Sequence, residues 1–100
     1  MPWLTAESKV PGGKFVRIKV DCSDGTIRNI MIEGDFFIHP EEGLVALESS
    51  LIGSRPMDGE GNMTRLRRAI EKDSLRLIGF DEAVIVDMLE GLDCSATDGA

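Results

Sequence analysis

The sequence predicts a single α+β domain, in which about three helices cover one face of a small three-stranded antiparallel sheet, a meander. First, residues 14–38 alternate between apolar and polar side chains with the period of two that strands require. Second, apolar residues after position 40 recur three and four apart, which is typical of amphipathic helices. Strands that precede helices along the chain favour an α+β arrangement.

Composition limits the classes of function. The chain has 100 residues, 42% of them hydrophobic, and no apolar run approaches the roughly 20 residues of a membrane span. The formal net charge of −7 argues against nucleic acid as a partner, because phosphate binding needs a basic surface. The N-terminus carries no export signal, so a cytoplasmic location is expected.

The two cysteines and the C-terminal residues suggest no chemistry. One histidine and two distant cysteines, Cys22 and Cys94, suit neither a disulfide framework nor a metal site, so we expect buried or terminal thiols and no bound metal. Residues 93–100 are small and polar, and a flexible tail is expected over 92–100.

Three strands are expected in the first part of the chain. Residues 3–10 alternate weakly, and the turn at 10–14 contains Pro11 and two glycines, which favour a reversal of direction. Residues 14–22 place aliphatic side chains on one face and charged side chains on the other, and their partner strand is expected at 26–38.

The loop of this hairpin decides its register. A two-residue loop would place Ile18 opposite Met31, whereas a three-residue loop at 23–25 places Ile18 opposite Ile30. We predict the three-residue loop, because it unites the aliphatic faces and puts Gly25 at the left-handed position of a bulge.

The first helix is expected at 40–52. Pro40 suits the first turn, the two glutamates after it suit the positive end of the helix dipole, and Gly53 is a C-terminal stop. Gly43 inside this helix costs about 1 kcal/mol relative to alanine. It either allows close backbone packing or has no structural role.

Two further helices are expected. Residues 53–62 have the composition of a mobile loop, and Asn62 is the candidate N-cap of a helix at 63–73. Asp81 is the candidate cap of a last helix at 82–90.

The chain offers few groups for catalysis. His39 is the only histidine, and it suits a cap or an interface better than proton transfer, because no nucleophile–base–orienter set accompanies it. The turn at 10–14 precedes a strand, so it lacks the helix N-terminus of a phosphate-binding loop. Arg65, Arg67 and Arg68 are either solvated or meet an acidic partner.

Two segments, in this order, give the chain a family resemblance. They are Lys9-Val10-Pro11-Gly12-Gly13-Lys14 and, after the hairpin, Gly34-Asp35-Phe36-Phe37-Ile38-His39-Pro40-Glu41-Glu42. Together they resemble the C-terminal or accessory domain of lipoate–protein ligases, above all the separately encoded small subunit of the archaeal form. Gly79-Phe80-Asp81-Glu82 is similar to the start of the family's last helix, and the resemblance covers about residues 8–91.

The resemblance implies a fold like that of SufE and NifU and a role without catalytic residues. The partner would be the catalytic large subunit, in a heterodimer. That subunit binds lipoate and ATP with magnesium, makes lipoyl-adenylate and modifies lipoyl carrier proteins. This chain would bind no cofactor itself. The matched positions, implied as interface or structural residues, are Lys9, Gly12, Gly13, Lys14, Asp35, Phe36, His39 and Pro40, with Arg65, Arg67 and Arg68 as secondary interface candidates.

Two other functions compete with this one. A sulfur-transfer or iron–sulfur scaffold domain would need a reactive cysteine or about three clustered ligands. An adaptor of another acyl- or biotin-ligase-like enzyme would differ only in its partner.

Overall fold

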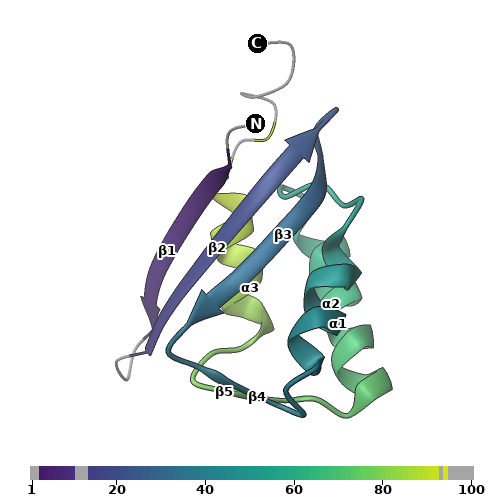
Figure 1. Cartoon of the computed structure of the whole chain (residues 1–100). Helices are drawn as coiled ribbons and strands as arrows, with labels where there is room; N and C mark the ends of the chain where they lie inside the picture. Colours follow the sequence, from purple (N-terminus) through teal and green to yellow (C-terminus); the bar gives the residue numbers. More distant parts are fainter. Residues whose placement is uncertain (1–2, 11–13, 93, 95–100) are drawn as a thin grey trace.

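The α+β class is confirmed by a computed structural model, which describes residues 3–10, 14–92 and 94 (Figure 1). Strands β1, β2 and β3 form the predicted antiparallel meander, and β4 pairs with β5 in a second, two-stranded sheet. The elements are β1 Leu4–Val10, β2 Lys14–Ser23, β3 Thr26–Gly34, β4 Phe37–His39, α1 Gly43–Leu51, α2 Gly59–Asp73, β5 Arg76–Ile78 and α3 Glu82–Glu90.

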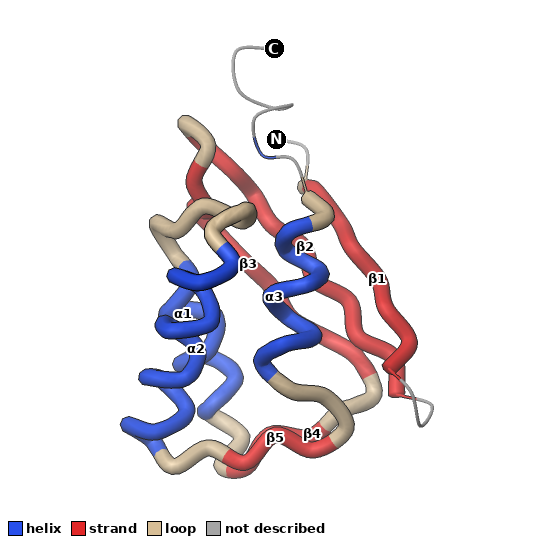
Figure 2. The backbone as a smooth tube through the Cα atoms, turned by 180° about the vertical axis from the view of Figure 1, so that it is seen from behind, coloured by secondary structure: helices blue, strands red, loops and turns tan. Residues whose placement is uncertain are grey.

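The three helices lie on one face of the meander, as the sequence predicts. Figure 2 shows α3 running along the back of the sheet, with α1 and α2 beside it. The space between is filled by aliphatic side chains, and burying them supplies the main stabilising free energy. Residues with less than 2% of their surface exposed include Val16, Ile18, Val20, Ile27, Leu47, Leu51, Leu66, Ile85 and Leu89.

The predicted register of the β2–β3 hairpin is wrong. The connection is a two-residue turn in which Asp24 and Gly25 both have positive φ, 54° and 76°, as in a type I′ turn. A bulge follows, and beyond it Ile18 pairs with Ile32. The extra residue in β3 reunites the aliphatic faces that a plain two-residue loop would separate.

The third predicted strand, 26–38, is divided in two at Gly34. This residue has a φ of 149°, and a Cβ there would collide with the carbonyl oxygen of Phe15. The chain turns after it, with the Asp35 N–H donating to that same oxygen at 2.8 Å. Residues 37–39 then pair with 76–78 rather than continuing along β2.

Two of the three predicted helix starts are corrected. The first helix begins at Gly43, and Pro40 lies in the turn before it, where the Gly43 N–H donates to its carbonyl at 2.9 Å. The second begins at Gly59, with Asp58 rather than Asn62 as its cap. The third runs over 82–90 as predicted, and the Asp81 side chain accepts from the Val84 N–H at 3.1 Å.

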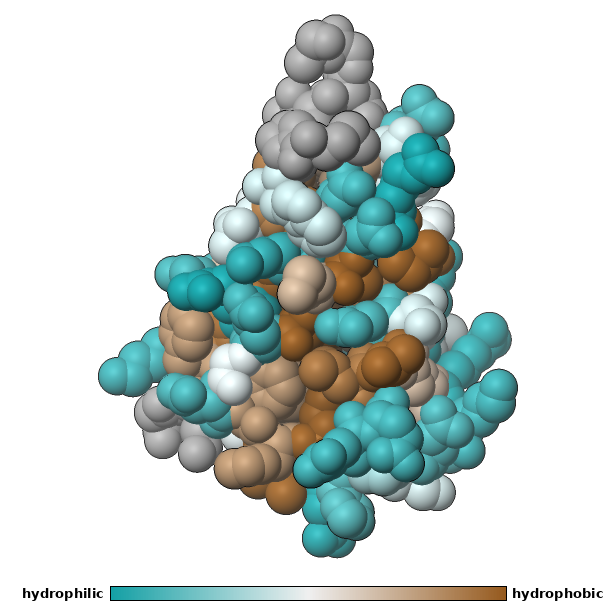
Figure 3. Space-filling model, viewed as in Figure 1, coloured by the Kyte–Doolittle hydropathy of each residue, from teal (hydrophilic) through white to brown (hydrophobic). Residues whose placement is uncertain are grey.

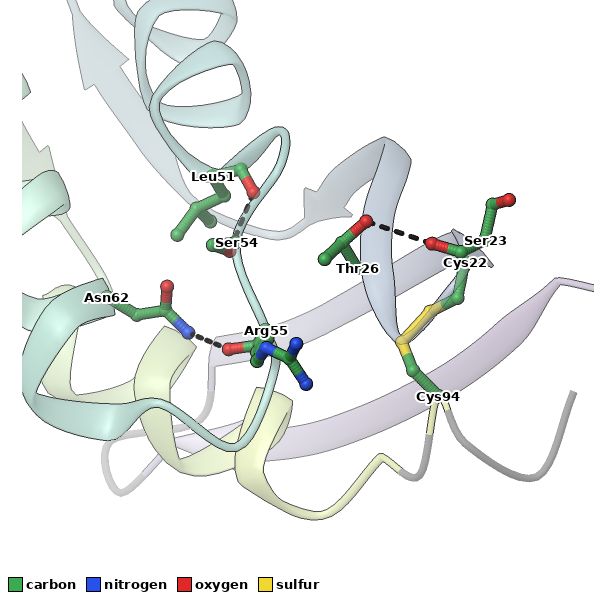
Figure 4. The surroundings of a disulfide bond; sticks show 8 residues. All are labelled: Cys22, Ser23, Thr26, Leu51, Ser54, Arg55, Asn62 and Cys94. Carbon is green, nitrogen blue, oxygen red and sulfur yellow. Dashed lines mark hydrogen bonds between the residues drawn. A yellow bond between two sulfur atoms is a disulfide. The ribbon is translucent and has the colours of Figure 1, made fainter. Parts of the chain in front are cut away.

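The cysteines form a disulfide, contrary to the prediction of two thiols. The chain after α3 returns to the end of β2, so Cys22 and Cys94 meet with their Cα atoms 5.6 Å apart (Figure 4). This separation lies within the usual range for a disulfide. Two residues of the predicted flexible tail, Leu92 and Cys94, are buried. The other residues of that tail, 93 and 95–100, lie outside the described part of the chain.

The outer face of the meander carries charged side chains. Arg17 donates to Glu7 at 2.8 Å and to Glu33 at 3.3 Å, and Lys19 lies 3.5 Å from Glu33. The hydrogen bond to Glu7, then that to Glu33, raises the pKa of the Arg17 guanidinium. Figure 3 shows this face as a mixture of hydrophilic and hydrophobic surface. Among the described helices, none has the length and apolar character to cross a membrane.

Candidate docking surface

The segment from Gly34 to Pro40 builds an exposed apolar surface through the ribbon of β4 and β5. Alternation along β4 turns Ile38 into the core, with 8% of its surface exposed. Phe37 points the other way and is 66% exposed, and its cross-strand partner Ile78 is 46% exposed. In Figure 3, apolar surface lies at the lower end of the molecule, where Figure 1 places β4 and β5. We call Phe37 and Ile78 the ribbon pair.

The rest of the segment anchors this surface to the core. The ring of Phe36 lies 4.2 Å, centroid to centroid, from the ring of buried Phe80, tilted by 35°. Phe36 is half-buried and packs against the hydrophobic core. A hollow of about 260 Å³ beside it is lined by Phe36, Phe37, Ile38, Glu41 and Leu44.

Gly43 allows the ribbon to approach α1 closely, which decides between the two roles left open for it. A Cβ on Gly43 would collide with a methyl group of Leu75 and lie 3.0 Å from a methyl group of Ile38. Leu75 is the residue before β5, and Ile38 lies in β4. The glycine thus fixes the distance between the helix and both strands of the ribbon.

His39 has no catalytic partner in the described part of the chain. It is exposed, it lies opposite Arg76 in the ribbon, and no hydrogen bond or ion pair of the described residues involves its side chain. Its peptide bond to Pro40 is cis. Asp35 is exposed at the turn after β3. Within the described residues, no group of three or more His, Cys, Asp or Glu side chains is placed to hold a metal ion.

The two segments of the family resemblance meet at the same end of the sheet. Lys9 pairs with Phe15 across β1 and β2, and the carbonyl of Phe15 accepts the Asp35 N–H. Lys9 is exposed, and Lys14 is the first residue of β2. Gly12 and Gly13 lie outside the described residues.

The three arginines of α2 do not act together. Arg67 faces α3, where its guanidinium lies 3.5 Å from the carboxylate of Glu82. Arg65 and Arg68 instead line a groove between α1 and α2. The predicted cluster is therefore divided between two faces of the helix.

The ribbon pair is the feature that the sequence did not single out. Phe36 and His39 are expected as interface or structural residues. Phe36 is half-buried beside Phe80, and Phe37 takes the exposed position. The inward Ile38 and the alternation of a strand indicate this once β4 is recognised. The arrangement suits protein binding, since exposed apolar side chains next to polar ones are typical of contact sites.

Comparison with known proteins supports the fold. Neither family models nor curated proteins match the sequence. Among the solved structures that resemble this chain is one with a TM-score of 0.73 and 24% identity, over 88% of this chain and 94% of that one. It belongs to the structural analysis of an archaeal lipoylation system from Thermoplasma acidophilum, a bi-partite lipoate protein ligase and its E2 lipoyl domain. The arrangement of the sheet and helices is thus a known one.

Proposed function

We propose that this chain is a non-catalytic accessory subunit of a two-part lipoate–protein ligase. It docks on the catalytic large subunit and enables that subunit to make lipoyl-adenylate from lipoate and ATP with magnesium. The likeness of its whole fold to a chain of an archaeal lipoylation system carries the proposal. The family resemblance of residues 9–14 and 34–42, two segments that lie at one end of the sheet, adds to it.

Docking through the ribbon pair explains how such a subunit acts. A bound protein shifts the equilibrium of its partner only by contacting one conformation better than the other. Burying Phe37 and Ile78 against one conformation supplies that difference, since each fully buried large apolar side chain contributes about 1.5–3 kcal/mol. Lipoate and ATP remain at the large subunit, and the modified carrier is contacted only indirectly.

The test combines the purified chain with the catalytic large subunit of an archaeal two-part ligase, lipoate, ATP and magnesium. Pyrophosphate release then reports adenylate formation, and we expect it to rise when the chain is added. Equal rates with and without the chain would contradict the proposal.

Two exposed apolar pairs make the docking test specific. Replacing Phe37 and Ile78 by alanine is expected to raise the concentration of chain needed for half-maximal activation by at least tenfold. Replacing Ile52 and Met57, which are 48% and 70% exposed, is the matched control and should change it less than twofold. Activation that survives the first double substitution would remove the ribbon pair from the docking surface.

The same reaction separates the alternatives. Mass spectrometry of the chain after incubation with a lipoyl carrier should show lipoate on the carrier only. Lipoate on Lys9, Lys19 or another lysine of this chain would make it a lipoyl acceptor instead. A sulfur-transfer role would require a thiol, and in this structure both cysteines of the sequence are in the disulfide. Capture of a different ligase from cell extract would favour the adaptor function.

A further inference from the structure

The groove between α1 and α2 combines an apolar floor with a basic rim. Its volume is about 430 Å³, and small side chains from the two helices, among them Ala46 and Ala69, leave it open. Arg65, Arg68 and Lys72 stand three and four positions apart, so they lie along the same face of α2. Ser49, Ser50 and one carboxylate, Asp73, complete the lining.

Within the described part of the chain, two of the three cations form no ion pair. Arg65 donates to Asp58 at 3.4 Å and to Asn62 at 3.1 Å. Arg68 and Lys72 take part in no ion pair or side-chain hydrogen bond among the described residues, although the sequence contains 18 acidic residues. Like charges one helical turn apart repel each other, so this pair slightly destabilises α2 when the chain is alone.

Charge and shape together identify the occupant. The chain carries a net charge of −7, so an exposed basic groove is the part of its surface that is complementary to an acidic protein. A small anion would use the rim and leave the alanine floor exposed. An amphipathic segment would use both, with its carboxylates at the rim and its apolar side chains on the floor, as helices do when they bind in grooves.

We infer that this groove binds an acidic, amphipathic segment of the catalytic large subunit. The inference rests on the proposed function and adds a second contact, which is electrostatic, to the apolar one at the ribbon pair. Arg68 and Lys72 pair with carboxylates of the partner. The hydrogen bond from Arg65 to Asn62 orients the Arg65 guanidinium in the groove. Paired charges of this kind mainly speed association and fix the orientation of the complex.

Calorimetry measures the dissociation constant of the complex between the full chain and the large subunit. The measurement is repeated from about 50 to about 500 mM NaCl, a range over which salt increasingly screens charges at a protein surface. Replacing both Arg68 and Lys72 by glutamate is expected to weaken binding at least tenfold at low salt and to flatten its salt dependence. Arg28→Glu is the control, because Arg28 is exposed on β3 without an ion pair in the described part. It should change the affinity less than threefold. Circular dichroism confirms that each variant is folded.

Each other outcome contradicts the inference in a recognisable way. If the wild-type chain binds and the doubly reversed chain binds equally well, the groove is not the contact, while the proposed function stands. If the wild-type chain neither binds nor activates the large subunit, both fail. Binding of inorganic phosphate or ATP to the chain alone, lost in the reversed variant, would assign the groove to a small anion. Self-association lost in that variant would assign it to a second copy.

Discussion

Replacing Asn62 by alanine should lower the free energy of unfolding more than replacing an exposed asparagine does. Asn62 is fully buried in α2, where its amide N–H donates to the carbonyl of Arg55 at 2.8 Å (Figure 4) and its oxygen accepts from Arg65 at 3.1 Å. Arg55 belongs to the loop between α1 and α2. This loop also contacts β3, because the Ile27 N–H donates to the carbonyl of Ser54. Asn62 therefore links the loop between α1 and α2 to the helix α2.

The magnitude follows from these contacts. An acceptor left without its donor costs about 1–3 kcal/mol. The lost hydrogen bond to Arg65 costs a further amount near 1 kcal/mol, the value for an ordinary hydrogen bond, because water reaches this half-exposed guanidinium. Alanine recovers roughly 0.5 kcal/mol through its helix propensity. The free energy of unfolding should fall by about 1.5–3.5 kcal/mol for Asn62→Ala, which lowers the melting temperature by roughly 6–28 °C in a domain of this size.

Asn29 provides the matched control. Its amide also donates one hydrogen bond, to Asp21 at 3.1 Å, but the side chain is exposed on the sheet. Asn29→Ala should cost less than about 1 kcal/mol, since water replaces the lost partner. Urea unfolding followed by far-ultraviolet circular dichroism, with the disulfide kept oxidised, measures both variants. Equal losses for Asn62 and Asn29 would refute the reasoning.

Three more predictions concern stability. Reducing the Cys22–Cys94 disulfide, which joins residues 72 positions apart, should lower the free energy of unfolding by about 4 kcal/mol, and an unchanged urea midpoint in reductant would contradict this. Gly43→Ala should lower the free energy of unfolding by about 1–2 kcal/mol, because overpacking against Leu75 and Ile38 outweighs the gain in helix propensity. Gly91→Ala is the control: a Cβ there would have its nearest contact at 3.5 Å, so the loss in the same assay should be less than about 0.5 kcal/mol. Asp81→Ala should cost about 1 kcal/mol in thermal unfolding, since it removes the cap of α3, and no change would show that the cap is dispensable.

The sequence predicted the elements that local signals define. The strand expected at 14–22 corresponds to β2, because a half-buried strand imposes strict alternation. The helix at 82–90 corresponds to α3, because its cap Asp81 and the glycine after it mark both ends. The overall order of strands and helices then gave the class of fold.

The errors arose where distant parts of the chain decide the structure. Strands β4 and β5 have three residues each and exist only through their pairing, which no local pattern indicates. Asn62 has the chemistry of a cap, but its partner is the carbonyl of Arg55, outside the helix. The Cys22–Cys94 bond depends on the path of α3 back along the sheet, which cysteine spacing does not reveal.

The interface or structural role of the eight matched positions, from Lys9 to Pro40, stays a prediction. Lys9 lies near residues 34–40 because its strand partner Phe15 accepts the Asp35 N–H, and this proximity could not be inferred without the register of β1 and β2. Phe36 lies in the bend before β4, whereas Phe37 is the first residue of that strand. Because the bend at Gly34 interrupts the strand expected at 26–38, the exposure of Phe37 follows only once β4 is recognised.

The most direct test of the account is the rate of lipoyl-adenylate formation by the large subunit as this chain is titrated into it. We predict that the rate rises and saturates at one chain per large subunit, and that the Phe37, Ile78 double alanine variant needs at least ten times more chain. A rate that does not depend on the chain at any concentration would contradict its role as an accessory subunit.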